Sequence, residues 1–387
     1  MFMRSLYSLI TIFILFSWTT KINSQCTSPV LTSQEMVNNF PQNCTSVTGD
    51  LFVNGLFNDI SDLSPLANVE SVSGRLILNG ITVQNLDQLV NIKTVGEEIQ
   101  VAGDYILNID KLLAIDNFNG EVILINCPLL TNVDGLSNIV TPSIVKLLNL
   151  SALSNIDGIS SVENYDELEL KNLPSLTDFS VLEDVDTINF LDLNNVPITD
   201  LTVFENVFLN GLRITDLNVS SFNGINKNLE YENAFSVNNC PLISDFTTLE
   251  LTKVAQFAIW GSSFQNFVGC PIKEIASFSI AQNAFLENID GLENVKITGT
   301  TANPLFSHSL TIGNNPLLND LSAMDTWELI LPLNGPGAAD IIECPNLSIC
   351  NYDLICHLIN LDPLNSVVYG NAQGLSLIHI SEPTRPY

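Results

Sequence analysis

Carboxylates, eight cysteines and three histidines are the residues of this chain that could perform acid–base or metal chemistry. A pair of carboxylates held across a cleft is what a glycosidase needs, and 42 acidic residues in 387 make close pairs common by chance. Such pairs occur at Asp166/Glu167 and at Glu183/Asp184/Asp186. The sequence contains no nucleophile elbow, phosphate-binding glycine loop or histidine-rich metal motif. It therefore predicts no catalytic residue and no cofactor, and an extracellular carbohydrate-active β-helix enzyme is the alternative.

The charge balance limits the kinds of partner. The chain has 13 Lys and Arg against 42 Asp and Glu, which gives a formal net charge of −29. Proteins that bind nucleic acid need basic patches, so this charge excludes nucleic acid as a partner and disfavours anionic membranes. It suits solubility outside the cell, cationic partners and divalent ions. With 46% hydrophobic and 14% charged residues, the chain has enough apolar side chains to build a core.

An apolar–x–apolar pattern recurs with a dominant step of 23 residues. One unit of this length cannot bury its own apolar side chains, whereas stacked units share a core and pair their strands. The sequence therefore predicts a mainly β solenoid of about twelve coils with capped ends. The last step is 32 residues, so we expect a loop near Thr298 to Ser307, which is the expected local specificity feature. The first residues of the twelve patterns are Leu51, Leu76, Ile99, Val122, Val145, Leu168, Leu191, Leu212, Phe235, Phe257, Phe278 and Leu310.

Two further apolar ridges keep the same phase. One follows each strand pattern by 9 to 11 residues, as at Ile60, Leu86 and Phe246, and the other comes three residues later in most coils, as at Leu63 and Leu89. Turns separate the sides of each coil. Asp-Gly pairs predict tight turns at one corner, and repeated Asn residues mark another, where their side chains are expected to hydrogen-bond along the stack. These Asn residues are Asn126, Asn172, Asn195, Asn239 and Asn314.

The cysteines are predicted to be mainly structural. Cys127 and Cys240 follow their strand patterns by five residues, a place that other coils fill with aliphatic side chains, so both thiols should lie in the core. Cys26 and Cys44 flank the first coil and are expected to form a disulfide that fastens an N-terminal cap.

Three further cysteines, Cys344, Cys350 and Cys356, cluster after the last coil. A disulfide between Cys350 and Cys356 is one hypothesis for this cluster. A zinc site that includes the nearby His357 is the alternative.

Two sets of residues are candidates for binding. Asp134, Asp157 and Asp290 share one turn position, so a calcium site is a second interpretation of these turns, which tight-turn geometry alone also explains. Exposed aromatic side chains would mark a binding face, and the candidates are Trp260, Tyr105 and Tyr231. No other metal site is expected.

Three segments carry a resemblance to a known family, namely residues 72–78, 129–136 and 285–292. They are similar to the leucine-rich repeat of the receptor L-domain family, and the resemblance extends over about residues 44 to 350. It implies a single-stranded, right-handed β-helix and a secreted or surface-attached protein of the bacterial type. A receptor ectodomain fragment is the alternative, and the lack of the Cys-rich module that separates paired L domains argues against it.

The two ends of the chain are interpreted separately. Arg4 followed by an apolar run predicts a signal peptide over residues 1–24, with a lipid anchor at Cys26 or an uncleaved membrane anchor as alternatives. Residues 375–387 resemble translated adapter sequence, so we interpret them as a cloning or assembly artefact. Between them we expect an N-terminal cap at 25–46, the solenoid at 47–335 and a truncated C-terminal cap at 336–374.

These observations together predict a secreted or cell-surface recognition or adhesion module. It would be non-catalytic, would have no membrane span in the mature chain, and would bind an extracellular protein or glycan through a face of the solenoid.

Overall fold

A computed structural model of the chain describes residues 24–115, 118–139, 142–225, 230–298, 308–330, 337–348, 352–361 and 363–372. Residues 1–23 of the predicted signal peptide, the insertion at 299–307, Cys350 and the segment 375–387 lie outside these ranges. In the described part, no helix is long and apolar enough to cross a bilayer.

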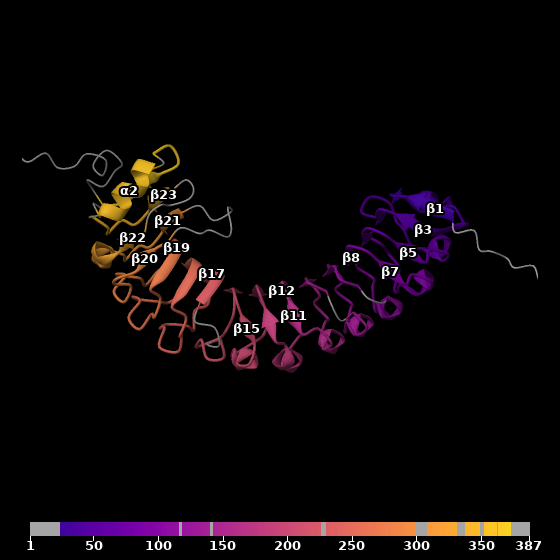
Figure 1. The fold of residues 1–387 in the computed structure, drawn as a ribbon, viewed down its shortest axis with the longest axis horizontal. Coiled ribbons are helices and arrows are strands. Elements are labelled where there is room, and N and C mark those ends of the chain that lie inside the picture. The colour runs from indigo at the N-terminus through magenta and orange to yellow at the C-terminus, as the bar shows by residue number, and fades with distance from the viewer. Residues whose placement is uncertain are drawn as a thin grey trace, which may run out of the picture.

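The chain folds as a curved solenoid, with its two ends at opposite ends of an arc (Figure 1). This confirms the predicted mainly β solenoid. The strands of one large parallel sheet line the inner side of the arc, and one-turn helices lie on the outer side (Figure 1). Hydrogen bonds hold neighbouring strands about 4.8 Å apart, whereas the bulkier helical turns keep the coils farther apart on the other side. The solenoid is therefore curved into an arc.

The large sheet takes one strand from each coil, and we call each such strand a rung. From the N-terminal end the rungs are β2 (Val30–Leu31), β4 (Leu51–Asn54), β6 (Leu76–Asn79), β8 (Glu98–Ala102), β9 (Glu121–Ile125), β10 (Ile144–Leu148), β12 (Glu167–Lys171), β14 (Leu191–Asn194), β16 (Leu212–Thr215), β17 (Glu230–Asn238), β18 (Lys253–Trp260), β19 (Glu274–Ala281), β21 (His308–Gly313), β23 (Gly337–Ile342) and β24 (Val367–Tyr369). The short strands β20 (Lys296–Ile297) and β22 (Glu328–Leu329) extend it beside β19.

The register of this sheet matches the sequence repeat. Leu51 lies opposite Leu76, Leu76 opposite Ile99, and the same alignment continues without a slip to Leu310. The ladder extends farther than the twelve predicted units, because β2 pairs with β4 at one end and β23 and β24 continue it at the other. Rungs therefore reach into both regions that were predicted to be caps.

A second side of each coil carries shorter elements. One small parallel sheet contains β1 (Ser24–Thr27), β3 (Cys44–Thr48), β5 (Ser71–Val72) and β7 (Thr94–Val95), and another contains β11 (Asn164–Tyr165), β13 (Thr187–Ile188) and β15 (Phe208–Leu209). The one-turn helices are η1 (Ser64–Leu66), η2 (Asp87–Leu89), η3 (Asp110–Ala114), η4 (Asp134–Leu136), η5 (Asp157–Ile159), η6 (Ser180–Asp184), η7 (Thr202–Phe204) and η8 (Ser322–Thr326). The α-helices are α1 (Gln34–Asn38) and α2 (Asp353–Leu361).

The core runs the length of the arc as one continuous cluster. The inward residues of the rungs and both predicted ridges are buried throughout. Towards the C-terminal end the core fillers become aromatic. Phe222, Phe246 and Phe267 come from successive coils and stack at centroid distances of 5.9 and 5.4 Å. The shared dry interior that the repeat predicts is therefore present in every described coil.

The asparagine corner forms the predicted ladder from Asn126 to Asn195, and farther along Asn239 donates to Asp216 in place of another Asn. The Nδ2 of Asn149 donates to Oδ1 of Asn126 at 2.8 Å, and Asn172 and Asn195 continue the chain of bonds at 2.7 and 2.9 Å. Each of these residues has a positive φ between 50° and 58°. Asn tolerates this left-handed conformation better than most residues do. The corner therefore selects Asn for its backbone as well as for its side chain.

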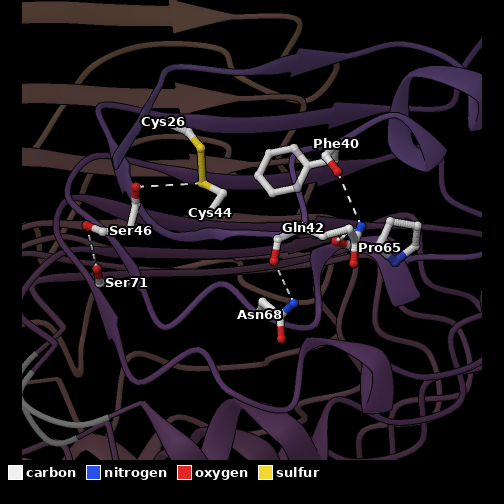
Figure 2. The surroundings of a disulfide bond; sticks show 8 residues. All are labelled: Cys26, Phe40, Gln42, Cys44, Ser46, Pro65, Asn68 and Ser71. Carbon is white, nitrogen blue, oxygen red and sulfur yellow. Dashed lines mark hydrogen bonds between the residues drawn. A yellow bond between two sulfur atoms is a disulfide. The ribbon is translucent and has the colours of Figure 1, made fainter. Parts of the chain in front are cut away.

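A disulfide joins Cys26 to Cys44 at the N-terminal end, as predicted (Figure 2). The surrounding segment is held by polar contacts, among them Asn68 Nδ2 to the carbonyl oxygen of Gln42 at 2.8 Å. At the other end, α2 packs on the last rungs through Ile355, Leu358 and Ile359, which are buried. Both ends of the core are thus covered by non-repeat elements.

Candidate recognition face

The side chains on the inner side of the arc stand on the large parallel sheet. Along each rung, alternate residues point into the core and out to solvent; we call the solvent-facing ones outer residues and the surface they form the concave face. Because the inward pairs of the repeat stay aligned from Leu51 to Leu310, with one register shift between Tyr231 and Ala234 that precedes the aligned part of β17, the outer residues beside them align in columns across the coils. The central column contains Val30, Phe52, Ile77, Gln100, Ile123, Lys146, Glu169, Asp192, Arg213, Ser236, Ala258, Ser279, Thr311 and Asp340.

The N-terminal part of this column is apolar. Val30 is 52% exposed, and Phe52 and Ile123 are partly exposed. Glu98 and Glu121 lie side by side along the edge of this stretch. Burial, with the neighbouring Glu121 charge, raises the pKa of the Glu98 carboxyl. This end of the face therefore combines exposed apolar side chains with a negative border.

The middle of the face is a set of ion pairs. Lys146 lies between Glu121 and Glu167, with its Nζ 3.1 and 3.3 Å from their carboxylate oxygens. Burial opposes the charge of Lys146, but the two carboxylates outweigh it and raise its pKa. Lys171 pairs with Glu169 on the same strand. The charges here largely neutralise one another.

Asp192 is the most deeply buried charged group of the face. Its side chain is 4% exposed, and its Oδ2 accepts a hydrogen bond of 3.1 Å from Nη1 of Arg213, whose side chain is 42% exposed. Burial raises the pKa of the Asp192 carboxyl despite the Arg213 charge, and its Oδ1 has no hydrogen-bond partner. The guanidinium also lies 5.2 Å from the ring centre of Phe190, within range of a cation–π contact.

Trp260 dominates the C-terminal part of the face. Its side chain is 43% exposed, and its Nε1 donates a hydrogen bond of 2.8 Å to Oγ of Ser279 on the next rung. Ala258 and Ser279 are buried. The indole is thus fixed on a floor of small side chains, and the prediction that Trp260 is exposed agrees with its position.

The other two aromatic candidates lie elsewhere. Tyr105 is 53% exposed, but it lies in a turn after β8 and off the sheet. Tyr231 is 1% exposed, and its hydroxyl donates to the carbonyl oxygen of Ile225 at 3.4 Å. The prediction that Tyr231 projects outward is therefore wrong. Tyr165 is buried in the same way and bonds to Ile159, which shows that both rings belong to the core.

A signal for Tyr231 was present in the sequence. Val72, Ile188, Val254 and Ile275 are also buried and also come three or four residues before their strand patterns. This is a fourth apolar ridge, and Tyr231 is one of its members. No pattern in the sequence marks Asp192 and Arg213 as partners, because their contact depends on the register between two neighbouring rungs.

The calcium candidates do not meet. Asp134 and Asp157 begin adjacent one-turn helices, η4 and η5, whereas Asp290 lies six coils beyond Asp157, which places it more than about 29 Å away, since strand spacing is the smallest separation between coils. Asp157 Oδ2 accepts a hydrogen bond of 2.8 Å from Asn155 Nδ2, which is a local turn contact. Across the described ranges, no group of three or more His, Cys, Asp or Glu side chains is arranged to hold a metal ion.

The carboxylates that suggested a hydrolase separate in the fold. Asp166 lines a polar hollow of about 640 Å³ on the second side of the coil and accepts a hydrogen bond of 3.0 Å from Asn189. Its neighbour Glu167 faces the concave side and pairs with Lys146. Asp166 lies in the bend between β11 and β12, before the strand that carries Glu167 begins, so the two adjacent carboxylates reach different surfaces.

The thiols also separate. Cys127, Cys240, Cys270 and Cys344 are buried. Burial raises the pKa of Cys127 and Cys240 to about 11 and that of Cys270 to about 12. Cys356 lies in α2 and is partly exposed. The interior thiols act as small core residues, as predicted for Cys127 and Cys240.

Comparison of the sequence with protein-family models and with curated proteins finds no match. The assignment of a function therefore depends on the geometry of the concave face.

Proposed function

We propose that this protein is a secreted or cell-surface recognition or adhesion module that binds an extracellular protein or glycan through its concave face, without catalysis. We further propose that it belongs with the leucine-rich solenoids of the receptor L-domain type. Two observations support this second proposal: the sequence resemblance, and the regular parallel ladder that the chain forms.

The observation that carries the proposal is the exposure of large apolar side chains on one ordered surface. Val30 and Trp260 are 52% and 43% exposed at outer positions of the concave face, on the first rung β2 and on β18. Exposed apolar patches with polar borders are typical of interaction sites, and rigid aromatic side chains contribute strongly to binding. The sheet beneath keeps both side chains in place without any rearrangement.

The charged groups of the face favour a binding function over a catalytic one. Lys146 is held between two carboxylates, and Arg213 is held by Asp192 and Phe190. A general acid or base needs a group that can gain or lose its proton near the reacting atoms, whereas these groups are fixed in neutralising pairs. Such a surface is well suited to selecting partners by shape and charge.

Export is proposed from two features. The Cys26–Cys44 disulfide persists only where the environment is oxidising. Residues 1–24 have the sequence pattern of a signal peptide, and fusing them to a reporter enzyme would test export directly. A reporter that stays in the cytosol would contradict this part of the proposal.

Binding is tested by screening the full chain against extracellular proteins and a glycan array. Substitutions Trp260→Ala and Ile123→Glu change the concave face, and Tyr105→Ala changes an equally exposed aromatic residue off the sheet. We expect a ligand whose affinity falls at least about tenfold with a face variant and is unchanged by Tyr105→Ala. Ligands that respond only to Tyr105→Ala would contradict the proposal. Breakdown of a bound glycan would support the hydrolase alternative.

A further inference from the structure

We infer that the Trp260 end of the concave face binds an uncharged saccharide, with a C–H face of a sugar ring stacked on the indole. The inference rests on the proposed function and specifies its ligand class. The site consists of the outer residues on the in-register parts of β17, β18 and β19, which we call the indole platform. It contains Ala234, Ser236, Asn238, Gln256, Ala258, Trp260, Ser277, Ser279 and Ala281.

The orientation of the indole is the first argument. Trp260 belongs to β18, but its Nε1 bonds to Ser279 on β19, so the ring leans across the sheet and not straight out from it. Ser279 and Ala258 are 6% and 5% exposed, whereas Trp260 is 43% exposed. The ring thus lies over small side chains and keeps solvent-accessible surface on its other side. A flat, immobilised aromatic face is complementary to the row of C–H groups on one side of a hexose ring.

The absence of charge is the second argument. The aligned segments 234–238, 256–260 and 277–281 contain no Asp, Glu, Lys, Arg or His, in a chain whose formal net charge is −29. Along the central column, the charged residue on the neighbouring rung is Arg213, which pairs with Asp192. The charged residues of the three strands themselves, among them Glu230, Lys253 and Glu274, lie at their N-terminal ends, away from Trp260. An anionic saccharide would find no cation on the platform and would be repelled by the chain as a whole. A cationic partner would find no carboxylate on it.

The polar groups around the indole are the third argument. Asn238 lies beside Trp260 in register, donates to Oγ1 of Thr215 at 3.3 Å, and accepts from Oγ of Ser236 at 3.3 Å. Hydroxyl and amide groups both donate and accept hydrogen bonds, as sugar hydroxyls do. Three rungs span about 10 Å, which is the length of a disaccharide. Ser236, Ser277 and Ser279 are buried, whereas Asn238 and Gln256 are partly exposed. The platform therefore offers one stacking surface with two accessible amide side chains beside it, on a scale that suits a short stretch of glycan.

Titration of the full chain with uncharged oligosaccharides tests the inference. The probes are β-1,4- and β-1,3-linked glucose, mannose and N-acetylglucosamine oligomers, with uronic-acid and sulfated oligomers of equal length for comparison. Calorimetry measures affinity, and tryptophan fluorescence reports contact with the ring. Beyond the predicted signal peptide the chain has only Trp260 and Trp327, and Trp327 is partly buried, donates to the Leu292 carbonyl oxygen and packs against Phe278.

We expect an uncharged oligomer to bind and to change the fluorescence of the wild-type chain. Trp260→Ala should weaken that binding at least about tenfold. Ser279→Ala keeps the indole but removes the hydrogen bond that orients it, and should weaken binding about threefold. Val268→Ala is the matched control, since Val268 is 60% exposed in the turn that follows β18 in the chain and lies off the sheet. It should leave the affinity unchanged.

Three results would overturn the inference. These are no binding of any uncharged oligomer at millimolar concentration, tighter binding of the charged oligomers, or equal affinities of the Trp260→Ala and wild-type chains. If a protein ligand instead binds and Trp260→Ala weakens it, the saccharide inference fails while the proposed recognition function stands. If no ligand of any class responds to concave-face variants, both fail.

Discussion

The Nδ2 of Asn172 donates to Oδ1 of Asn149 at 2.7 Å, one coil earlier, while its own Oδ1 accepts from Asn195 at 2.9 Å. Asn172 also holds a φ of 55°. A single side chain therefore links three coils and stabilises a backbone conformation that most residues avoid. The corner is accordingly a sensitive place to test how the coils hold together.

Replacing Asn172 with Ala should lower the free energy of unfolding by about 2 to 4 kcal/mol, because two hydrogen bonds and a favourable left-handed residue are lost together. Asn172→Gly keeps the backbone freedom and should lose about half as much. Urea unfolding followed by circular dichroism measures both. Exposed Asn218 lies outside the ladder, and its Ala variant is the control. Equal losses for Ala and Gly would show that the backbone conformation contributes nothing.

The buried carboxylate of Asp192 leads to a second prediction. Arg213→Ala should destabilise the fold by about 2 kcal/mol, because it leaves a desolvated carboxylate without its partner. The double variant Asp192→Asn/Arg213→Ala should recover most of this loss. Arg75→Ala is the control, since the Arg75–Asp50 pair is 47% and 31% exposed and should cost less than about 1 kcal/mol. Unfolding midpoints compare these variants and the single variant Asp192→Asn with the wild type, and losses of the two single variants that add up in the double variant would contradict the coupling.

The interior thiols should resist chemical modification. Burial raises the pKa of Cys127 and Cys240 to about 11 and of Cys270 to about 12, so almost no thiolate exists at pH 8. Peptide mapping after iodoacetamide treatment should find all three unmodified in the native protein and fully modified in guanidinium chloride. Native modification of Cys127 would show that its coil opens.

Lowering the pH should destabilise the turns that contain Asp200 and Asp245. Hydrogen bonds from Thr202 lower the pKa of Asp200, and those from Thr247 lower the pKa of Asp245. A lowered folded-state pKa means that these carboxylates stabilise the fold above the ordinary Asp value, near 3.9, and that this contribution is lost as the pH falls through their lowered values.

The double variant Asp200→Asn/Asp245→Asn keeps an accepting oxygen in each turn but cannot titrate. Its difference in unfolding midpoint from the wild type should be constant above about pH 5 and should shrink below the ordinary Asp value. Urea titrations between pH 2 and pH 7 measure this difference. A difference that does not change with pH would contradict the role of the two carboxylates.

The solenoid and its register follow from the sequence because alternation along a strand and burial in a stack both leave a periodic trace. Leu51, Leu168 and Phe278 were placed inside by that trace, and all three are buried. The periodic pattern did not predict the end rungs, because their sequences depart from it. The inward pair of β23 begins with Ala339, and β2 contains only two residues.

Other features depend on contacts that a linear pattern does not contain. The curvature arises from the unequal widths of the two sides of a coil. The pairing of Asp192 with Arg213 joins residues that are 21 positions apart in the sequence but adjacent in space. The position of Trp260 on the strand was visible in the sequence, but the bond that turns its ring across the sheet requires Ser279 at the matching place on the next rung.

The parallel ladder joins each rung only to the rungs beside it, apart from the short side strands near β19. A molecule with this connectivity bears tension in series when its ends are pulled apart, because each hydrogen-bonded junction carries the same load. One junction can give way while those beyond it hold, and each released coil of about 23 residues adds roughly 75 Å of extended chain. A protein anchored at one end and bound to a partner at the other would then lengthen stepwise under force and stay attached.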